Sequence, residues 1–290
     1  MSDPTSRDAS PAHTAVANAA PYASYLTRWN LEADGDEIVT RAARLLPVRQ
    51  ADEPAMLRIA THAEAKDGGV LLAWWDGEGA ARVLEAEGDA LLIERAEGGR
   101  SLAAMARSGQ DDEATQIICD VIAELHAPRM KPLPDLISLN DWFAALWPAA
   151  AKHGGLLAQS ADAAQRLLSA QREIGALHGD IHHDNILDFG PERGWLAIDP
   201  NRLCGDRAFD YANLFCNPDM DDPSQPVAVN PERFRQRLDI VVAKAGLERQ
   251  RLLSWILAYS GLSAAWLIGD GDEASVDFQI AALAAAELAR

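Results

Sequence analysis

The chain has 290 residues, a formal net charge of -18 and 48% hydrophobic residues. This length can bury a large core and suggests about two domains, on a scale of roughly 150 residues per domain. The acidic excess argues against nucleic acid as a partner, because phosphate backbones are bound by Lys and Arg, and it favours cationic small molecules.

The cysteines and the first residues bear on the cellular compartment. Cys119, Cys204 and Cys216 are odd in number, widely spaced and form no CxxC pair, so neither a disulfide framework nor a zinc finger is expected. Residues 1–20 lack a basic segment followed by an apolar block, and we expect a disordered lead-in there. The sequence therefore predicts a cytoplasmic protein.

The first third of the chain alternates strand and helix patterns. A helix is expected at 22–34, and residues 63–75 have helical apolar spacing. Short apolar runs separated by turn residues predict two strand pairs, at 43–48 with 55–60 and at 80–85 with 89–94. The polar stretch 97–100 that follows is the expected hinge between two lobes, which we place at 21–97 and 98–290.

The rest of the chain is mainly helical in pattern. Apolar periodicity predicts helices at 111–126, 140–147, 161–173, 251–268 and 274–290. Residues 252–269 carry no charge and approach the ~18 residues of a membrane span. Several polar side chains and the absence of flanking basic clusters favour a buried helical hairpin instead. The predicted fold class is α+β, with a small sheet lobe and a larger helical lobe.

The residues 177–200 carry the clearest chemical pattern. His178, Asp180 and Asn185 have the His-x-Asp-x-x-x-x-Asn spacing of a kinase catalytic loop, in which the Asp accepts the hydroxyl proton and the Asn binds a metal. A predicted hairpin then ends at Asp199, where kinases place a second metal ligand. Because Pro200 and Asn201 follow it instead of Phe-Gly, a protein kinase with a switching Phe is not expected.

The nucleotide site is expected on the sheet lobe. Arg58 stands mid-strand where a kinase has the phosphate-binding Lys, and Glu64 is its expected ion-pair partner. Extended backbone from Glu94 to Ala96 could bind an adenine edge. Neither a Gly-x-Gly-x-x-Gly nor a Walker A motif is present, so the phosphate-covering loop is expected at 40–44.

Other charged residues have competing interpretations. His178, His182 and His183 cluster with acids, but adjacent histidines tend to point in opposite directions, which disfavours a zinc site. A cationic acceptor could pair with acids of the large lobe, although each is also compatible with a solvated turn; these are Asp219, Asp221, Asp222, Asp270, Asp272 and Glu273.

From residue 22 onward the chain resembles the aminoglycoside phosphotransferases, most closely the streptomycin 6-kinase branch of aminoglycoside or hydroxyurea resistance kinases. The similarity is carried by LLPV with PAMLRI, LLAWWDGEGAARVL, LLIERA, LHGDIHHDNILDFG and WLAIDPNRLCGDRAFDYANLFCNP. The resemblance implies a bilobal protein-kinase-like fold, ATP as phosphoryl donor and Mg²⁺ as metal. It also implies a small alcohol as phosphoryl acceptor, and the expected acceptor is an aminoglycoside such as streptomycin.

The same resemblance assigns individual roles. Asp180 would be catalytic, Asn185 and Asp199 would bind the metal, and Glu64 would pair with the basic strand residue. His178 would brace the loop.

Two further features qualify these assignments. Asp206 and Asp210 match an acidic pair after the metal Asp, and Asp210 is expected to cap a helix or brace a loop. Arg58 departs from the family's Lys. Two alternatives stay open. Because the fold and the catalytic loop do not fix the acceptor, the chain could be a kinase of another small hydroxylated metabolite. Because of Arg58, it could be a nucleotide-binding pseudoenzyme.

Overall fold

The computed structural model describes residues 21–40, 43–61 and 68–290. By their contacts these residues form two compact units. The first unit contains residues up to 66 together with Val83–Arg95, and the second contains Asp67–Arg82 together with Ala96–Arg290. The expected lobe division after residue 97 stays a prediction, and the contacts group the helical segment 67–82 with the second unit.

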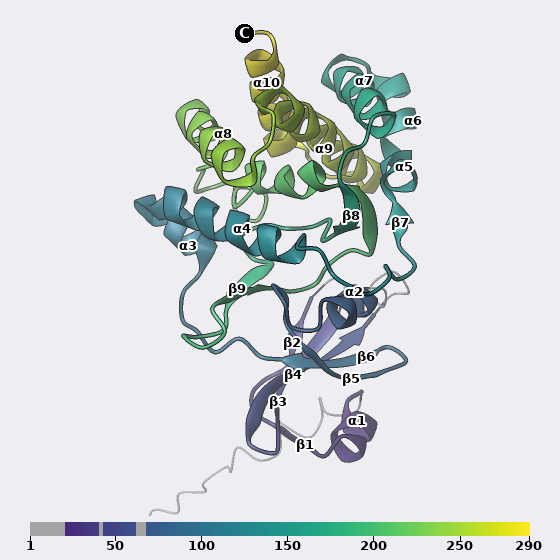
Figure 1. Ribbon diagram of the computed structural model, residues 1–290, viewed down its shortest axis with the longest axis vertical. Coiled ribbons are helices and arrows are strands. Elements are labelled where there is room, and N and C mark those ends of the chain that lie inside the picture. Colours follow the sequence, from purple (N-terminus) through teal and green to yellow (C-terminus); the bar gives the residue numbers. More distant parts are fainter. Residues whose placement is uncertain (1–20, 41–42, 62–67) are drawn as a thin grey trace, which may run out of the picture. The chain divides into compact units, whose positions relative to one another are not determined.

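The first unit is an antiparallel sheet with one short helix, α1 (Ala23–Arg28) (Figure 1). The sheet order is β1-β3-β4-β6-β5, with β2 paired to β3, and the strands are β1 (Leu31–Ala33), β2 (Ile38–Val39), β3 (Ala43–Gln50), β4 (Glu53–Ala60), β5 (Val83–Glu87) and β6 (Ala90–Glu94). Both predicted strand pairs are present. The expected helix at 22–34 was too long, because its second half forms β1 against β3.

The core of the first unit explains why these strands form. Large apolar side chains that flank α1 or lie on the central strands are buried together, among them Tyr22, Trp29, Val48, Leu57 and Leu92. Alternate residues of β3 and β4 point into this cluster, as the two-residue period of a strand requires. The expected phosphate-covering loop lies partly outside the described residues, at 41–42, and Ala43 and Arg44 belong to β3.

The second unit is mostly helical (Figure 1). Its helices are α2 (Gly68–Trp75), α3 (Leu102–Met105), the π-helix η3 (Ala106–Gln110), α4 (Asp111–Leu125), α5 (Leu139–Trp142), η4 (Phe143–Ala145), α6 (Leu146–His153), α7 (Gly155–Leu168), η5 (Arg207–Tyr211), η6 (Asn213–Phe215), α8 (Pro231–Ala245), α9 (Arg249–Asp270) and α10 (Ser275–Leu288). The expected helix at 140–147 is broken into three short pieces, and Ser138 caps the first of them.

Two small sheets in the second unit support the chemical loop. One is the hairpin of β9 (Ile186–Asp188) and β10 (Trp195–Ala197), where a hairpin was predicted. The other has the order β7-β11-β8 and consists of β7 (Ile137–Ser138), β11 (Leu203–Asp206) and β8 (Ile174–Leu177). The loop from Leu177 to Ile186 therefore connects one sheet to the other.

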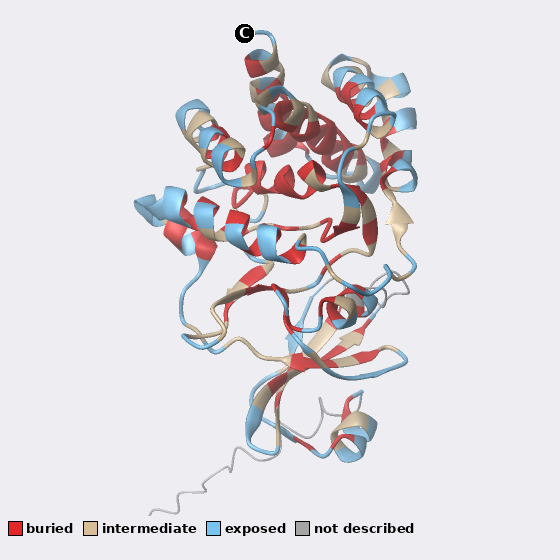
Figure 2. Ribbon diagram, in the orientation of Figure 1, coloured by how far each residue is buried: buried red, intermediate tan, exposed pale blue. Residues whose placement is uncertain are grey.

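Helix α9 forms the centre of the helical core. It packs against α7 and α10, and Figure 2 shows it buried along most of its length. Within the described part of the chain, α9 alone is long and apolar enough to cross a membrane, yet 72% of its most apolar window is buried inside the fold. Its hydrophobicity is that of a core helix, as the sequence led us to expect.

Candidate active site

The candidate catalytic loop begins where β8 ends. His178 and Gly179 are buried, and Asp180 follows them at the surface of the second unit. Gly179 has φ +80°, and a Cβ at this position would lie 2.5 Å from Leu203 Cδ1. Only glycine fits both the left-handed backbone and this close approach. The glycine between His178 and Asp180 is therefore a steric requirement of the turn that presents Asp180.

A buried carboxylate, Asp210 in η5, holds the backbone of this turn. Its Oδ2 accepts hydrogen bonds from His178 N at 2.9 Å and from His126 Nε2 at 2.8 Å. Its Oδ1 accepts one from Gly179 N at 2.8 Å. Asp210 therefore braces the loop, one of the two roles expected for it, whereas Asp206 caps η5 by accepting from Ala208 N.

The His178 side chain ties the loop to the segment that precedes Asp199. Its Nδ1 accepts from Asp180 N at 3.2 Å, and its Nε2 donates to Ile198 O at 2.9 Å. Complete burial lowers the pKa of His178, so the ring is neutral with its proton on Nε2. The structure thus places His178 as the expected brace of the loop.

Two amide side chains orient the Asp180 carboxylate. Asn185 Nδ2 donates to Asp180 Oδ2 at 3.0 Å and to Asp180 O at 2.8 Å. Asn213 Nδ2 donates to Asp180 Oδ1 at 2.9 Å. Each carboxylate oxygen is therefore directed by an amide, which fixes the orientation of the group.

Asn213 was missed in the sequence interpretation. It lies in η6, and Asn217 Nδ2 in turn donates to Asn213 Oδ1 at 2.9 Å. The available signal was a polar residue within the otherwise apolar run 211–216. No spacing rule connects that run to Asp180, because the two are brought together only by the tertiary fold.

Burial and several neighbouring groups affect the ionisation of Asp180. Desolvation by the surrounding protein raises the pKa of Asp180, and the Asp199 carboxylate raises it further, against lowering by His182, His178 and Asn185. The Asp180 side chain still has 43% of its surface exposed. Asp180 is thus a carboxylate of increased basicity that remains accessible to a reactant.

The expected metal ligands lie on adjoining segments. Ile198 N donates to Asn185 O at 2.9 Å, which joins the segments that carry Asn185 and Asp199. Asp199 is exposed and has φ 54°. Asn185 uses only its Nδ2 in contacts with the described residues, which leaves its Oδ1 available. An amide oxygen next to carboxylates is an oxygen donor set that suits Mg²⁺.

The adjacent histidines point in different directions. His182 Nε2 lies 3.9 Å from Asp180 Oδ2. His183 is buried, neither ring nitrogen has a hydrogen-bond partner, and burial lowers its pKa well below the usual value. Across the described residues no group of three or more His, Cys, Asp or Glu side chains is arranged to hold a metal.

The expected nucleotide-binding residues are divided between the units. Arg58, in β4, is buried at 7% exposure, and Glu94 ends β6 in the same sheet. Ala96 is the first residue of the following part of the second unit. Glu64 lies outside the described residues. The roles of these four residues stay predictions.

Two of the acids considered for a cationic acceptor have structural partners. Asp219 is buried and accepts hydrogen bonds from the backbone of Val227, Ala228 and Val229 at 2.8–3.1 Å. Asp222 accepts from Ser224 N at 3.0 Å, in a local turn. Asp221, Asp270, Asp272 and Glu273 are exposed.

Comparison with known proteins identifies the family of the chain. Residues 28–271 match the family model of aminoglycoside/hydroxyurea antibiotic resistance kinases. The chain is 54% identical to a streptomycin 3''-kinase of Klebsiella pneumoniae over 89% of this chain and 98% of that protein. It is 32% identical to a streptomycin 6-kinase of Streptomyces glaucescens over 86% and 82%, respectively.

Solved structures support the fold. An aminoglycoside phosphotransferase APH(4)-Ia bound to ADP and hygromycin B has a TM-score of 0.64 at 15% identity, covering 90% of this chain and 97% of that one. A choline/ethanolamine kinase family protein of Mesorhizobium loti has a TM-score of 0.61 at 14% identity, covering 88% and 87%. The expected protein-kinase-like fold is confirmed, and the chain belongs to the aminoglycoside/hydroxyurea antibiotic resistance kinase family.

Proposed function

We propose that the chain is a cytoplasmic phosphotransferase that moves the γ-phosphoryl group of ATP to a hydroxyl group of streptomycin, and that the 3'' position is the one modified. The observation that carries the reaction type is the Asp180 carboxylate, held by Asn185 and Asn213 beside Asp199. The 54% identity to a streptomycin 3''-kinase, against 32% to a streptomycin 6-kinase, favours the 3'' hydroxyl.

In this proposal Asp180 orients the acceptor hydroxyl and takes its proton as the new P–O bond forms. The bond between the γ-phosphorus and the bridging oxygen breaks at the same time, and ADP leaves with the electron pair. The raised pKa of Asp180 suits this role, because a more basic carboxylate accepts a proton more readily. Asn213 and Asn185 keep both carboxylate oxygens in place, which contributes through positioning.

Asn185 Oδ1 and Asp199 would hold Mg²⁺, which supplies neutralisation of the phosphate charge when bound. On the first unit, Arg58 would contact the non-transferred phosphates, with Glu64 as its partner. A guanidinium carries the same charge as the Lys of related kinases in a wider, forked geometry. The backbone between Glu94 and Ala96 would bind the adenine edge. The lobes 21–97 and 98–290 would then bind nucleotide and acceptor, respectively.

The test compares Asp180→Asn with wild type in an ATP-consumption assay with streptomycin. Loss of the proton acceptor should lower kcat by about 10²- to 10⁴-fold, the usual contribution of a general base. Asp162→Asn is a matched control, because Asp162 is an exposed residue of α7. Wild-type turnover by Asp180→Asn would refute the assignment.

Analysis of the product separates the acceptor positions. Mass spectrometry should detect the addition of one phosphoryl group to streptomycin, and phosphorus–proton NMR should locate it at the 3'' carbon. Coupling to the 6 position would contradict the 3'' assignment while leaving the kinase activity intact. If another hydroxylated metabolite is phosphorylated and streptomycin is not, that metabolite takes the place of streptomycin as the proposed acceptor.

Arg58 motivates a second candidate, a protein that binds nucleotide without turnover. ATP-Mg²⁺ binding by calorimetry with no product across a panel of aminoglycosides would favour it. In that case Arg58→Lys should gain activity, because lysine is the residue that the phosphate-binding position of kinases carries. Activity of wild type on streptomycin rules this candidate out.

A further inference from the structure

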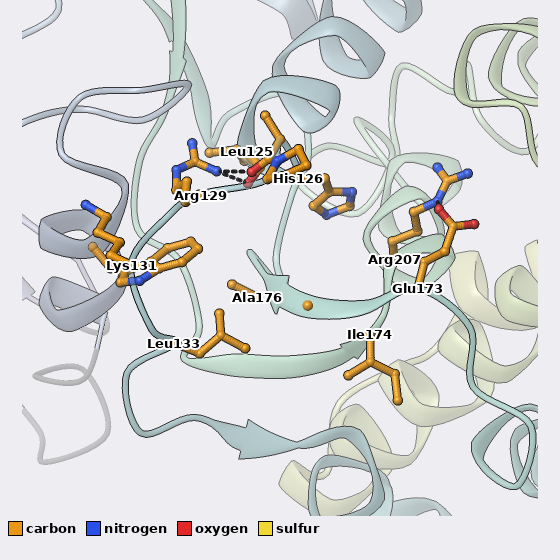
Figure 3. Close-up of a pocket in the computed structure, with 13 residues that line it drawn as sticks. Leu125, His126, Arg129, Lys131, Leu133, Glu173, Ile174, Ala176 and Arg207 are labelled. Carbon is orange, nitrogen blue, oxygen red and sulfur yellow. Dashed lines mark hydrogen bonds and ion pairs between the residues drawn. The ribbon is translucent and has the colours of Figure 1, made fainter.

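A cavity lies in the second unit, and the Asp180 carboxylate is not part of its lining. It has a volume of about 400 Å³, within the range of small-molecule sites. Its walls come from the end of α4 and the turn after it, from β8, from η5 and from Trp74 of α2 (Figure 3). Neither Asp180, Asn185 nor Asp199 lines it.

The charge of the cavity lining differs from that of the chain. Three cationic side chains line it, Arg129, Lys131 and Arg207, with one carboxylate, Glu173. Arg129 Nε lies 3.2 Å from Glu78 Oε2, and Arg207 pairs with Glu173. The excess positive charge therefore rests on Lys131, in a chain whose net charge is -18. An anionic ligand is therefore the electrostatic complement of the cavity.

One of the three cations is uncommitted. Arg207 pairs with Glu173 at 2.6 Å, and Arg129 donates to the carbonyl oxygens of Leu125 and Ala127 at the end of α4. Within the described part of the chain Lys131 has no carboxylate partner, and its ammonium lies 5.7 Å from the centroid of the Trp74 ring. Lys131 is thus the cation that can receive an anion at the edge of an aromatic wall.

The remaining surface of the cavity is largely apolar. Leu133 and Ile174 line it and are 45% and 61% exposed, which is unusual for large aliphatic side chains. The Trp74 ring, which also lines the cavity, lies under the cationic groups of Arg129 and Lys131, at 5.3 and 5.7 Å from its centroid. The combination fits an aromatic anion, whose ring covers the apolar wall while its charged group meets the cation.

The cavity also contacts the brace of the catalytic loop. His126 lines it, and its Nε2 donates to Asp210 Oδ2, which also accepts from His178 N. Within the described part of the chain, His126 Nδ1 is closed off from solvent and has no hydrogen-bond partner. A ligand in the cavity would therefore act on the brace through contact with the His126 ring, whose Nε2 is bonded to Asp210.

We propose that this cavity is a binding site for a small aromatic anion, and that its occupancy changes the order of the catalytic loop through His126 and Asp210. The lining of the site includes none of the residues proposed to bind ATP or Mg²⁺ or to act in catalysis. The site would let a metabolite adjust how firmly the backbone of His178 and Gly179 is held, and hence how Asp180 is positioned.

Binding is tested on the full chain with 8-anilinonaphthalene-1-sulfonate, a fluorescent aromatic anion. One saturable site per chain is expected. Lys131→Glu should weaken binding by about tenfold or more, the scale of one lost charge-assisted contact. Lys131→Arg keeps the charge and should bind within about twofold of wild type. Lys152→Glu makes the same charge change on exposed α6 and should leave the affinity unchanged.

Equal affinity in wild type and Lys131→Glu would overturn the site, as would displacement of the probe by ATP or streptomycin. The coupling is read from amide hydrogen exchange of His178 and Gly179, whose N–H groups bind Asp210. Their exchange rates should change on probe binding in wild type but not in Lys131→Glu. Unchanged rates with the site occupied would refute the coupling. Neither measurement requires turnover, so failure of the proposed kinase activity leaves this test valid.

Discussion

The brace at Asp210 allows a sharp test of how the fold positions the candidate catalytic group. Three donors converge on its carboxylate: His178 N, Gly179 N and His126 Nε2. Asn at position 210 has almost the same shape but only one acceptor oxygen. Its amide NH₂ must then face at least one of these donors. The lowest-cost orientation turns the NH₂ toward Gly179 N. The hydrogen bond from Gly179 N is then lost, and two N–H donors, the introduced amide and the Gly179 backbone, face each other.

The magnitude follows from those contacts. A hydrogen bond to a charged group contributes about 1.5–3 kcal/mol, and an unsatisfied buried donor costs about 1–3 kcal/mol. We therefore expect Asp210→Asn to lower the free energy of unfolding by about 3 kcal/mol. The turn that presents Asp180 should shift, and a displacement of ~1 Å can reduce kcat by about 10²-fold.

The assay combines urea unfolding, followed by circular dichroism, with steady-state kinetics on ATP and streptomycin below the unfolding transition. Because Asp210 acts through the loop, kcat should fall while KM for ATP changes little. Asp162→Asn, exposed on α7, serves as the control for removal of one charge. A folded Asp210→Asn protein with kcat within about twofold of wild type would refute the positioning argument.

Three further substitutions test other parts of the second unit. Arg237 is fully buried and bonded to Asp111. Arg237→Met should lower the free energy of unfolding, measured in urea, by about 3–5 kcal/mol, because Asp111 stays buried without this cation. Burial raises the pKa of Asp277 to about 6. The folded state therefore binds more protons than the unfolded chain between about pH 4 and 6, so its stability falls as pH rises through that window. Asp277→Asn should be more stable than wild type by up to ~3 kcal/mol at about pH 8 and nearly equal at about pH 4 in urea unfolding. Gly261→Ala should lower stability by about 1–3 kcal/mol in thermal unfolding, since its Cβ would lie 2.2 Å from Ser160 Cβ.

Each of these has a clear contrary result. A stability change below about 1 kcal/mol in Arg237→Met would mean that Asp111 is adequately held by other groups, such as Arg233. A pH-independent difference between Asp277→Asn and wild type would argue against a carboxylate that titrates in the fold. An unchanged melting temperature in Gly261→Ala would show that α7 and α9 can separate without cost.

The sequence alone predicted most of the local structure near the candidate site. Strand pairs follow from two-residue alternation and turn residues, and α9 follows from a long apolar run. The spacing of His178, Asp180 and Asn185 predicted a phosphotransfer loop, because the groups of such a loop are separated by a fixed number of residues.

The structure showed contacts between residues that are far apart in the sequence. Asn213 reaches Asp180 from 33 residues away, and His126 reaches Asp210 from 84 residues away. No periodicity encodes such pairs, because they depend on how η5, η6 and α4 pack. The same holds for Asp219, whose carboxylate was an open candidate for substrate until its backbone partners were seen.

The sequence by itself therefore determined the fold class and the family and predicted the residues of the candidate catalytic loop, because these depend on local patterns and on strings shared with relatives. Only the tertiary structure showed that Asp180 is held by two amides, that Asp210 connects the loop to His126, and that a cationic cavity lies behind that connection. Contacts of this kind arise from packing between distant segments, which a linear pattern does not specify.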